Sequence, residues 1–180
     1  HNVVAYRACA TSAMREATNG KQIVSKLKAA TGIDIQIIDG NDEAAIIATT
    51  DLRQLISDDK VFLYVDVGGG STEFTLFANG HNIASQSFKL GTVRIINDMV
   101  SDTTWEKAKN WVTQHTKEYT KVNVIGSGGN INSIYRFSEK KVGKPLSYLF
   151  MSNFYEQVKQ LDYNQRVFDL KLNPDRADVI

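Results

Sequence analysis

The sequence is poor in cysteine and proline and carries no excess charge of either sign. Its single cysteine, Cys9, excludes an internal disulfide, and we expect a reducing, cytoplasmic setting. Two prolines are too few for a linker-rich or disordered chain. The 21 basic residues almost balance the 20 acidic ones, so the chain lacks the basic excess typical of nucleic-acid binding, and we expect no nucleic-acid partner.

Long apolar runs and metal-binding motifs are also missing. No apolar run is long enough to span a bilayer and no signal-peptide pattern is present, so we expect no membrane partner. The three histidines and Cys9 lack the spacing of a zinc or iron site.

The 180 residues are 42% hydrophobic, which suits one globular domain, or one domain with a piece of another. The chain opens at His1, and Val3 to Ala8 already predicts a strand. We therefore expect the start to lie inside a larger protein.

Predicted strands and helices alternate along the chain, which favours an α/β fold. Val61 to Val67 is an apolar strand, and alternation over 74–78 indicates the next one. Asn79-Gly80 predicts a type I′ turn into a returning strand, because both residues tolerate positive φ. Antiparallel strands within an α/β pattern predict a mixed sheet.

Helices are predicted on both sides of these strands. Glu43 lies at the opening of one helix. The pattern Thr103-x-x-Glu106 predicts a capping box at the start of another. Residues 148–165 predict one long helix, and 173–175 the start of a last one.

The strongest chemical signal is the segment Asp66-Val67-Gly68-Gly69-Gly70-Ser71-Thr72-Glu73, which lies between two predicted strands. Its glycines allow a tight turn with bare backbone amides, and successive amides form an anion-binding nest. The candidate phosphate-binding residues are Gly68, Gly69, Gly70 and Ser71. Asp66 and Glu73 bracket the loop, and two carboxylates beside a phosphate can hold a magnesium ion. The alternative is a bulged hairpin with polar ends.

This segment resembles the phosphate-binding hairpin of the exopolyphosphatase/guanosine pentaphosphate phosphatase family, which belongs to the actin-like superfamily. Four further stretches resemble family motifs in the family's order, and they span almost the whole chain: 10–17 with Asn19, 40–44, 126–130 and 174–178.

The resemblance implies a ribonuclease-H-like (actin-like ATPase) α/β fold with a mixed sheet. Residues 1–55 are expected to be the end of the first domain, and residues 56–180 most of the second. The polar stretch 51–60 marks the expected junction. Family members normally begin with a further glycine-rich hairpin that does not precede His1 here, so we expect an active parent protein that is longer than this chain.

The resemblance also implies roles for particular residues. Glu43 matches the general base that activates the attacking water, although a first-turn glutamate favoured by the helix dipole is the alternative. Arg15 matches an arginine that neutralises phosphate, with a surface ion pair as the alternative. Arg94 is a weaker candidate for the same role, and we expect it to be exposed. Gly128 and Gly129 match a second phosphate-lining loop, or else a tight turn for close packing.

The function that the resemblance implies is hydrolysis of the terminal phosphate of inorganic polyphosphate or the 5′-phosphate of guanosine pentaphosphate. The implied cofactor is Mg²⁺, with a monovalent cation left open, and the implied assembly is a homodimer. Two alternatives remain: another actin-like kinase or ATPase, and a sensor that binds such anions without turnover.

Overall fold

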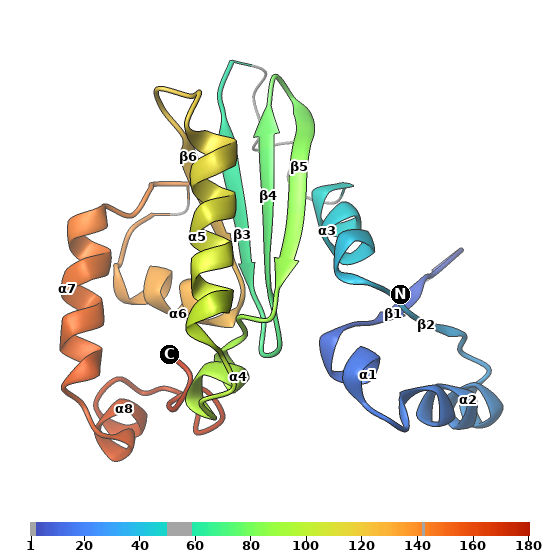
Figure 1. The fold of residues 1–180 in the computed structure, drawn as a ribbon. Coiled ribbons are helices and arrows are strands. Elements are labelled where there is room, and N and C mark those ends of the chain that lie inside the picture. Colours follow the sequence, from blue (N-terminus) through green and yellow to red (C-terminus); the bar gives the residue numbers. More distant parts are fainter. Residues whose placement is uncertain (1–2, 50–58, 142) are drawn as a thin grey trace.

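The computed structural model describes residues 3–49, 59–141 and 143–180. Two short strands, β1 (Ala8–Ala10) and β2 (Ile35–Ile37), pair in parallel. A second sheet has the order β5-β4-β3-β6 (Figure 1). Its strands are β3 (Phe62–Val67), β4 (Thr72–Ala78), β5 (His81–Phe88) and β6 (Asn123–Ser127). Because β6 runs parallel to β3 while β4 is antiparallel to both its neighbours, the predicted mixed sheet is confirmed.

The hairpin between β4 and β5 turns as the sequence predicts. Asn79 and Gly80 both have positive φ, at 52° and 74°, as a type I′ turn requires. The hairpin between β3 and β4 is closed by the glycine loop, and its register places Asp66 opposite Glu73.

Helices cover the larger sheet and surround the smaller one (Figure 1). They are α1 (Ser12–Glu16), α2 (Gly20–Thr31), α3 (Gly40–Thr49), α4 (Thr92–Ile96), α5 (Asp102–Thr116), α6 (Gly129–Phe137), α7 (Tyr148–Lys159) and α8 (Tyr163–Phe168). Trp111 of α5 packs against Phe74 and Phe88 on one face of the larger sheet. Successive strand residues face opposite sides, so Ser87 lies on the other face, where it meets Gly40 at the start of α3. The cavity described below opens on this second face.

Several predicted boundaries are wrong, each because another contact or cap decides the end of the element. The first strand begins at Ala8, where pairing with β2 starts, and not at Val3. Helix α5 is capped by Ser101, whose side chain accepts from the Thr104 amide, and not by Thr103. The long helix over 148–165 is two helices, because Asp162 forms a capping box that starts α8.

At the C-terminus, residues 174–179 form turns in place of the predicted helix. The expected domain junction at 51–60 lies almost wholly outside the described residues. Across the described ranges, no helix combines the length and the apolar character that crossing a bilayer demands.

Candidate active site

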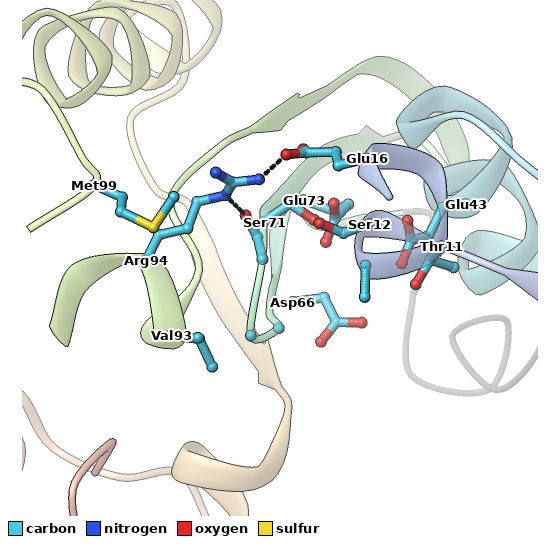
Figure 2. A pocket seen from close by; sticks show the side chains of 14 residues that line it. Thr11, Ser12, Glu16, Glu43, Asp66, Ser71, Glu73, Val93, Arg94 and Met99 are labelled. Atoms are coloured by element: carbon cyan, nitrogen blue, oxygen red, sulfur yellow. Dashed lines mark hydrogen bonds and ion pairs between the residues drawn. The ribbon is translucent and has the colours of Figure 1, made fainter. Parts of the chain in front are cut away.

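A cavity of about 470 Å³ opens between α1, α3, α4 and the glycine loop (Figure 2). The loop residues Gly68–Ser71 form one wall, and Thr11, Ser12 and Ala13 of the α1 end form another. Four carboxylates, Glu16, Glu43, Asp66 and Glu73, also line it. The cavity therefore combines backbone donors with a concentration of negative charge.

The glycine loop is a tight turn with backbone amides left over. The Gly68 amide donates to the Ser71 carbonyl at 2.9 Å and closes the turn. Within the described residues, the amides of Gly69, Gly70 and Ser71 have no intramolecular acceptor. Successive amides left free in such a turn can form a nest for an anion, so this loop is suited to an anion or to water. Glycine is required at position 70 by packing, because a Cβ there would overlap the Ser12 hydroxyl.

Two carboxylates lie side by side on the sheet, held by a hydroxyl at each end. The strand registers align Ser127, Asp66, Glu73 and Ser87 in one row across β6, β3, β4 and β5. Ser87 Oγ donates to Glu73 Oε1 at 2.8 Å. A hydrogen bond from Ser127 stabilises ionised Asp66, but burial outweighs it and raises the pKa of Asp66. The row places both carboxylates directly below the loop.

Glu43 reaches the same cavity from the first turn of α3. Its side chain is 17% exposed, and its Oε2 atom is buried without a hydrogen-bond partner. Burial raises the pKa of Glu43, the charges of Glu73 and Asp66 add to the rise, and Arg15 opposes it. A carboxylate with a raised pKa at the wall of a cavity is suited to take a proton from water.

Arg15 lies behind Glu43 and is not among the residues that line the cavity. Its Nη1 atom donates to the Ile38 carbonyl at 2.6 Å and lies 3.6 Å from Glu43 Oε2, which makes an ion pair too long for a hydrogen bond. In this structure Arg15 therefore contacts the Glu43 carboxylate and the Ile38 carbonyl, which lies just before α3.

Arg94 lies at the cavity, and the expectation that it is exposed is wrong. Only 15% of its side chain is exposed, and it contacts Glu16 and the Gly70 carbonyl. The sequence reasoning also passed over Ser12 and Ser87. Ser12 lies within the family-like stretch 10–17, but nothing local indicates that either serine contacts the site, because their partners lie far away in the chain.

The second glycine loop lies outside the lining of this cavity. Gly128 has φ 108°, and a Cβ there would come within 2.5 Å of the Val67 carbonyl oxygen. A Cβ at Gly129 would lie 2.7 Å from the Arg176 guanidinium. These contacts show a tight turn between β6 and α6 that packs closely against its neighbours.

The carboxylates offer a modest set of metal ligands. Over residues 3–49, 59–141 and 143–180 there is no group of three or more His, Cys, Asp or Glu side chains that could hold a metal ion. Two neighbouring carboxylates, Asp66 and Glu73, suit magnesium, which usually takes one or two carboxylates and completes its shell with water and substrate phosphates.

Comparison with known proteins decides the family. A sequence profile described as the Ppx/GppA phosphatase family matches residues 1–180. The chain belongs to the Ppx/GppA phosphatase family. Its fold is accordingly the actin-like α/β fold of Ppx/GppA proteins.

Curated Ppx/GppA relatives are much longer than this chain. A bifunctional 3-dehydroquinate synthase/phosphatase of Fusobacterium nucleatum is 33% identical over 198 residues, covering 95% of this chain and 29% of the relative. A guanosine-5′-triphosphate,3′-diphosphate pyrophosphatase of Photobacterium profundum is 29% identical over 140 residues, covering 71% of this chain and 28% of the relative. Exopolyphosphatase 1 of Mycobacterium tuberculosis is 30% identical over 95 residues, covering 53% of this chain and 28% of the relative. The matched stretches thus cover less than a third of each of these relatives.

Solved structures show the same fold. An exopolyphosphatase from Cytophaga hutchinsonii superposes with a TM-score of 0.78 at 22% identity, covering 98% of this chain and 64% of that one. The Ppx/GppA protein of Aquifex aeolicus gives a TM-score of 0.71 at 18% identity, covering 96% of this chain and 61% of that one.

Proposed function

We propose that the whole protein hydrolyses a terminal phosphoanhydride, either of inorganic polyphosphate or at the 5′ end of guanosine pentaphosphate. The names of the relatives support this substrate class, because they include exopolyphosphatases and a guanosine-5′-triphosphate,3′-diphosphate pyrophosphatase. The observation that carries the proposal is the position of Glu43. Its carboxylate has a raised pKa, and it shares one cavity with the Gly68–Ser71 loop.

In the proposed mechanism, the terminal phosphate lies on the amides of Gly69, Gly70 and Ser71. A water between this phosphate and Glu43 gives its proton to the carboxylate as its oxygen attacks phosphorus in line with the leaving phosphate oxygen. The bond between phosphorus and that oxygen breaks, and the shortened anion leaves. Positioning and charge neutralisation carry most of the catalysis in phosphoryl transfer, while the general base adds about 10²- to 10⁴-fold.

The charge of the cavity calls for a cation. Four carboxylates line it, and the charge of Arg94 is already paired with Glu16. A polyanionic substrate would meet repulsion here unless a divalent cation accompanied it. Asp66 and Glu73, adjacent in the strand register, would hold Mg²⁺, which when bound would neutralise charge on the transferred and leaving phosphates.

We also propose that residues 1–55 and 56–180 belong to two domains that meet at this cavity. The separate sheets of β1–β2 and β3–β6 support this division. Glu16 and Glu43 would then come from one domain, and the glycine loop from the other.

The test is phosphate release by the whole protein from polyphosphate and from guanosine pentaphosphate, with Mg²⁺ and with a chelator. Glu43→Ala should lower kcat by about 10²-fold or more, because it removes the base. Glu118→Ala, at an exposed glutamate beyond α5, is the matched control and should behave as wild type. Retained activity in Glu43→Ala would exclude this role. ATP consumption that needs a co-substrate would favour a kinase, and binding without turnover a sensor.

A further inference from the structure

Helix α4 lies directly behind the glycine loop and holds its carbonyl groups. The Thr92 amide donates to the Gly68 carbonyl at 3.0 Å, and the Val93 amide to the Gly69 carbonyl at 2.9 Å. The close approach depends on Gly91, where a Cβ would overlap the Gly69 carbonyl oxygen. Two successive loop carbonyls are therefore fixed by backbone donors of one short helix.

The third carbonyl in the series is fixed by a side chain. Arg94 Nε donates to the Gly70 carbonyl at 2.7 Å (Figure 2). In a planar trans peptide the C=O and the following N–H point in opposite directions, and no described peptide bond is cis. Holding the carbonyls of residues 68–70 on α4 therefore turns the amides of residues 69–71 away from α4. Arg94 thus orients the Ser71 amide.

Glu16 holds the other end of the same guanidinium. Its carboxylate forms an ion pair with Arg94 Nη2 and lies 3.5 Å from Lys89 Nζ. The hydrogen bond from Arg94 is the main reason that the pKa of Glu16 is lowered. The side chain of Lys89 is 70% exposed, and that of Arg94 only 15%. The planar fork of arginine can serve the carbonyl and the carboxylate together, which a lysine ammonium cannot do in the same geometry.

We propose that Arg94 is a positioning residue, which fixes the Gly70–Ser71 peptide so that the Ser71 amide faces the bound phosphate. Glu16 keeps the guanidinium on the Gly70 carbonyl and links α1 to the loop. Arg94 therefore acts through the backbone and contributes orientation, whereas a direct phosphate ligand would contribute charge. This inference rests on the proposed phosphate-binding role of the loop.

The experiment compares orientation with charge in the whole protein. Affinity for inorganic phosphate is measured by titration calorimetry with Mg²⁺ present, and kcat and KM by phosphate release. Arg94→Lys keeps the charge and loses the fork, so phosphate affinity should fall about 10-fold and kcat about 10²-fold. Glu16→Gln should show a smaller loss in the same direction, because the amide oxygen still accepts from Arg94.

Lys89→Met is the matched control, since it removes the second cation on Glu16 without touching the loop. Its phosphate affinity and kcat should stay within about twofold of wild type, as for an exposed ion pair. Wild-type values in Arg94→Lys, or an equal loss in Lys89→Met, overturn the inference. If Arg94→Lys does not fold by circular dichroism, Glu16→Gln against Lys89→Met makes the same comparison.

The phosphate titration separates the two proposals. If neither substrate is turned over, but Arg94→Lys weakens phosphate binding and Lys89→Met does not, the hydrolase proposal fails and the positioning role stands. If the wild type binds no phosphate, the inference is overturned.

Discussion

Gly40→Ala tests whether packing at the start of α3 positions Glu43. Helix α3 contacts β5 and β4, and its first residue, Gly40, meets Ser87. An alanine Cβ at position 40 would lie 2.5 Å from the Ser87 Cβ, whereas ordinary contact begins at 3.4 Å. The helix end must therefore move by about 1 Å, and Glu43, one turn further along, moves with it.

Two consequences follow from this displacement. Overpacking of this kind costs roughly 1–3 kcal/mol of stability. A displacement of about 1 Å in a catalytic group can lower turnover about 10²-fold. We expect kcat to fall by that order while KM changes less, because the loop itself is untouched.

Gly32→Ala is the matched control for this substitution. Gly32 ends α2 with φ 74°, and a Cβ there meets nothing within 4 Å. Its strain costs roughly 1–2 kcal/mol without moving a cavity residue. The assay combines urea unfolding with phosphate release by the whole protein. A Gly40→Ala protein with normal kcat, or a Gly32→Ala protein with an equal loss, would refute the idea that this contact positions Glu43.

Three further predictions concern the cavity. Glu43→Gln should lower kcat by about 10²-fold or more, yet raise the melting temperature at pH 7, because the fold disfavours the ionised carboxylate. Since the pKa of Glu43 is raised above 4.5, the folded protein binds this proton more tightly than the unfolded chain. The contribution of Glu43 to the free energy of unfolding should therefore fall as pH rises from 4.5 through the raised pKa. Urea unfolding of Glu43→Gln, measured over the same pH range, should lack this fall. Activity should rise over the same range as Glu43 ionises, so a flat acid limb in kcat would contradict the assignment. Gly70→Ala, which overlaps Ser12, should weaken phosphate binding about 10-fold or more, and adding Ser12→Gly should restore part of it; no recovery would mean that the loop fails for another reason.

Much of the larger sheet could be predicted from sequence because its signals are local. Asn79 and Gly80 adopt the positive φ that their residue types favour, and β3 follows its apolar run almost to the residue. The hairpin register that pairs Asp66 with Glu73 follows from the short glycine loop between them. The errors occurred where a cap was overlooked, as at Asp162, which caps α8 after α7 has ended at Lys159.

The glycine loop, the pair Asp66 and Glu73, and the candidate base Glu43 could all be proposed from the sequence, because each is encoded within a few neighbouring residues or by a family motif. The shared cavity could not, since it depends on α1, α3 and α4 approaching one loop. Arg94 and Glu16 stand 78 residues apart, and nothing in either segment signals the other. The local sequence determined the glycine turn and its register. Only tertiary packing decided that Arg94 hydrogen-bonds to the loop and that the Glu43 carboxylate is largely buried, because both depend on segments far apart in the chain.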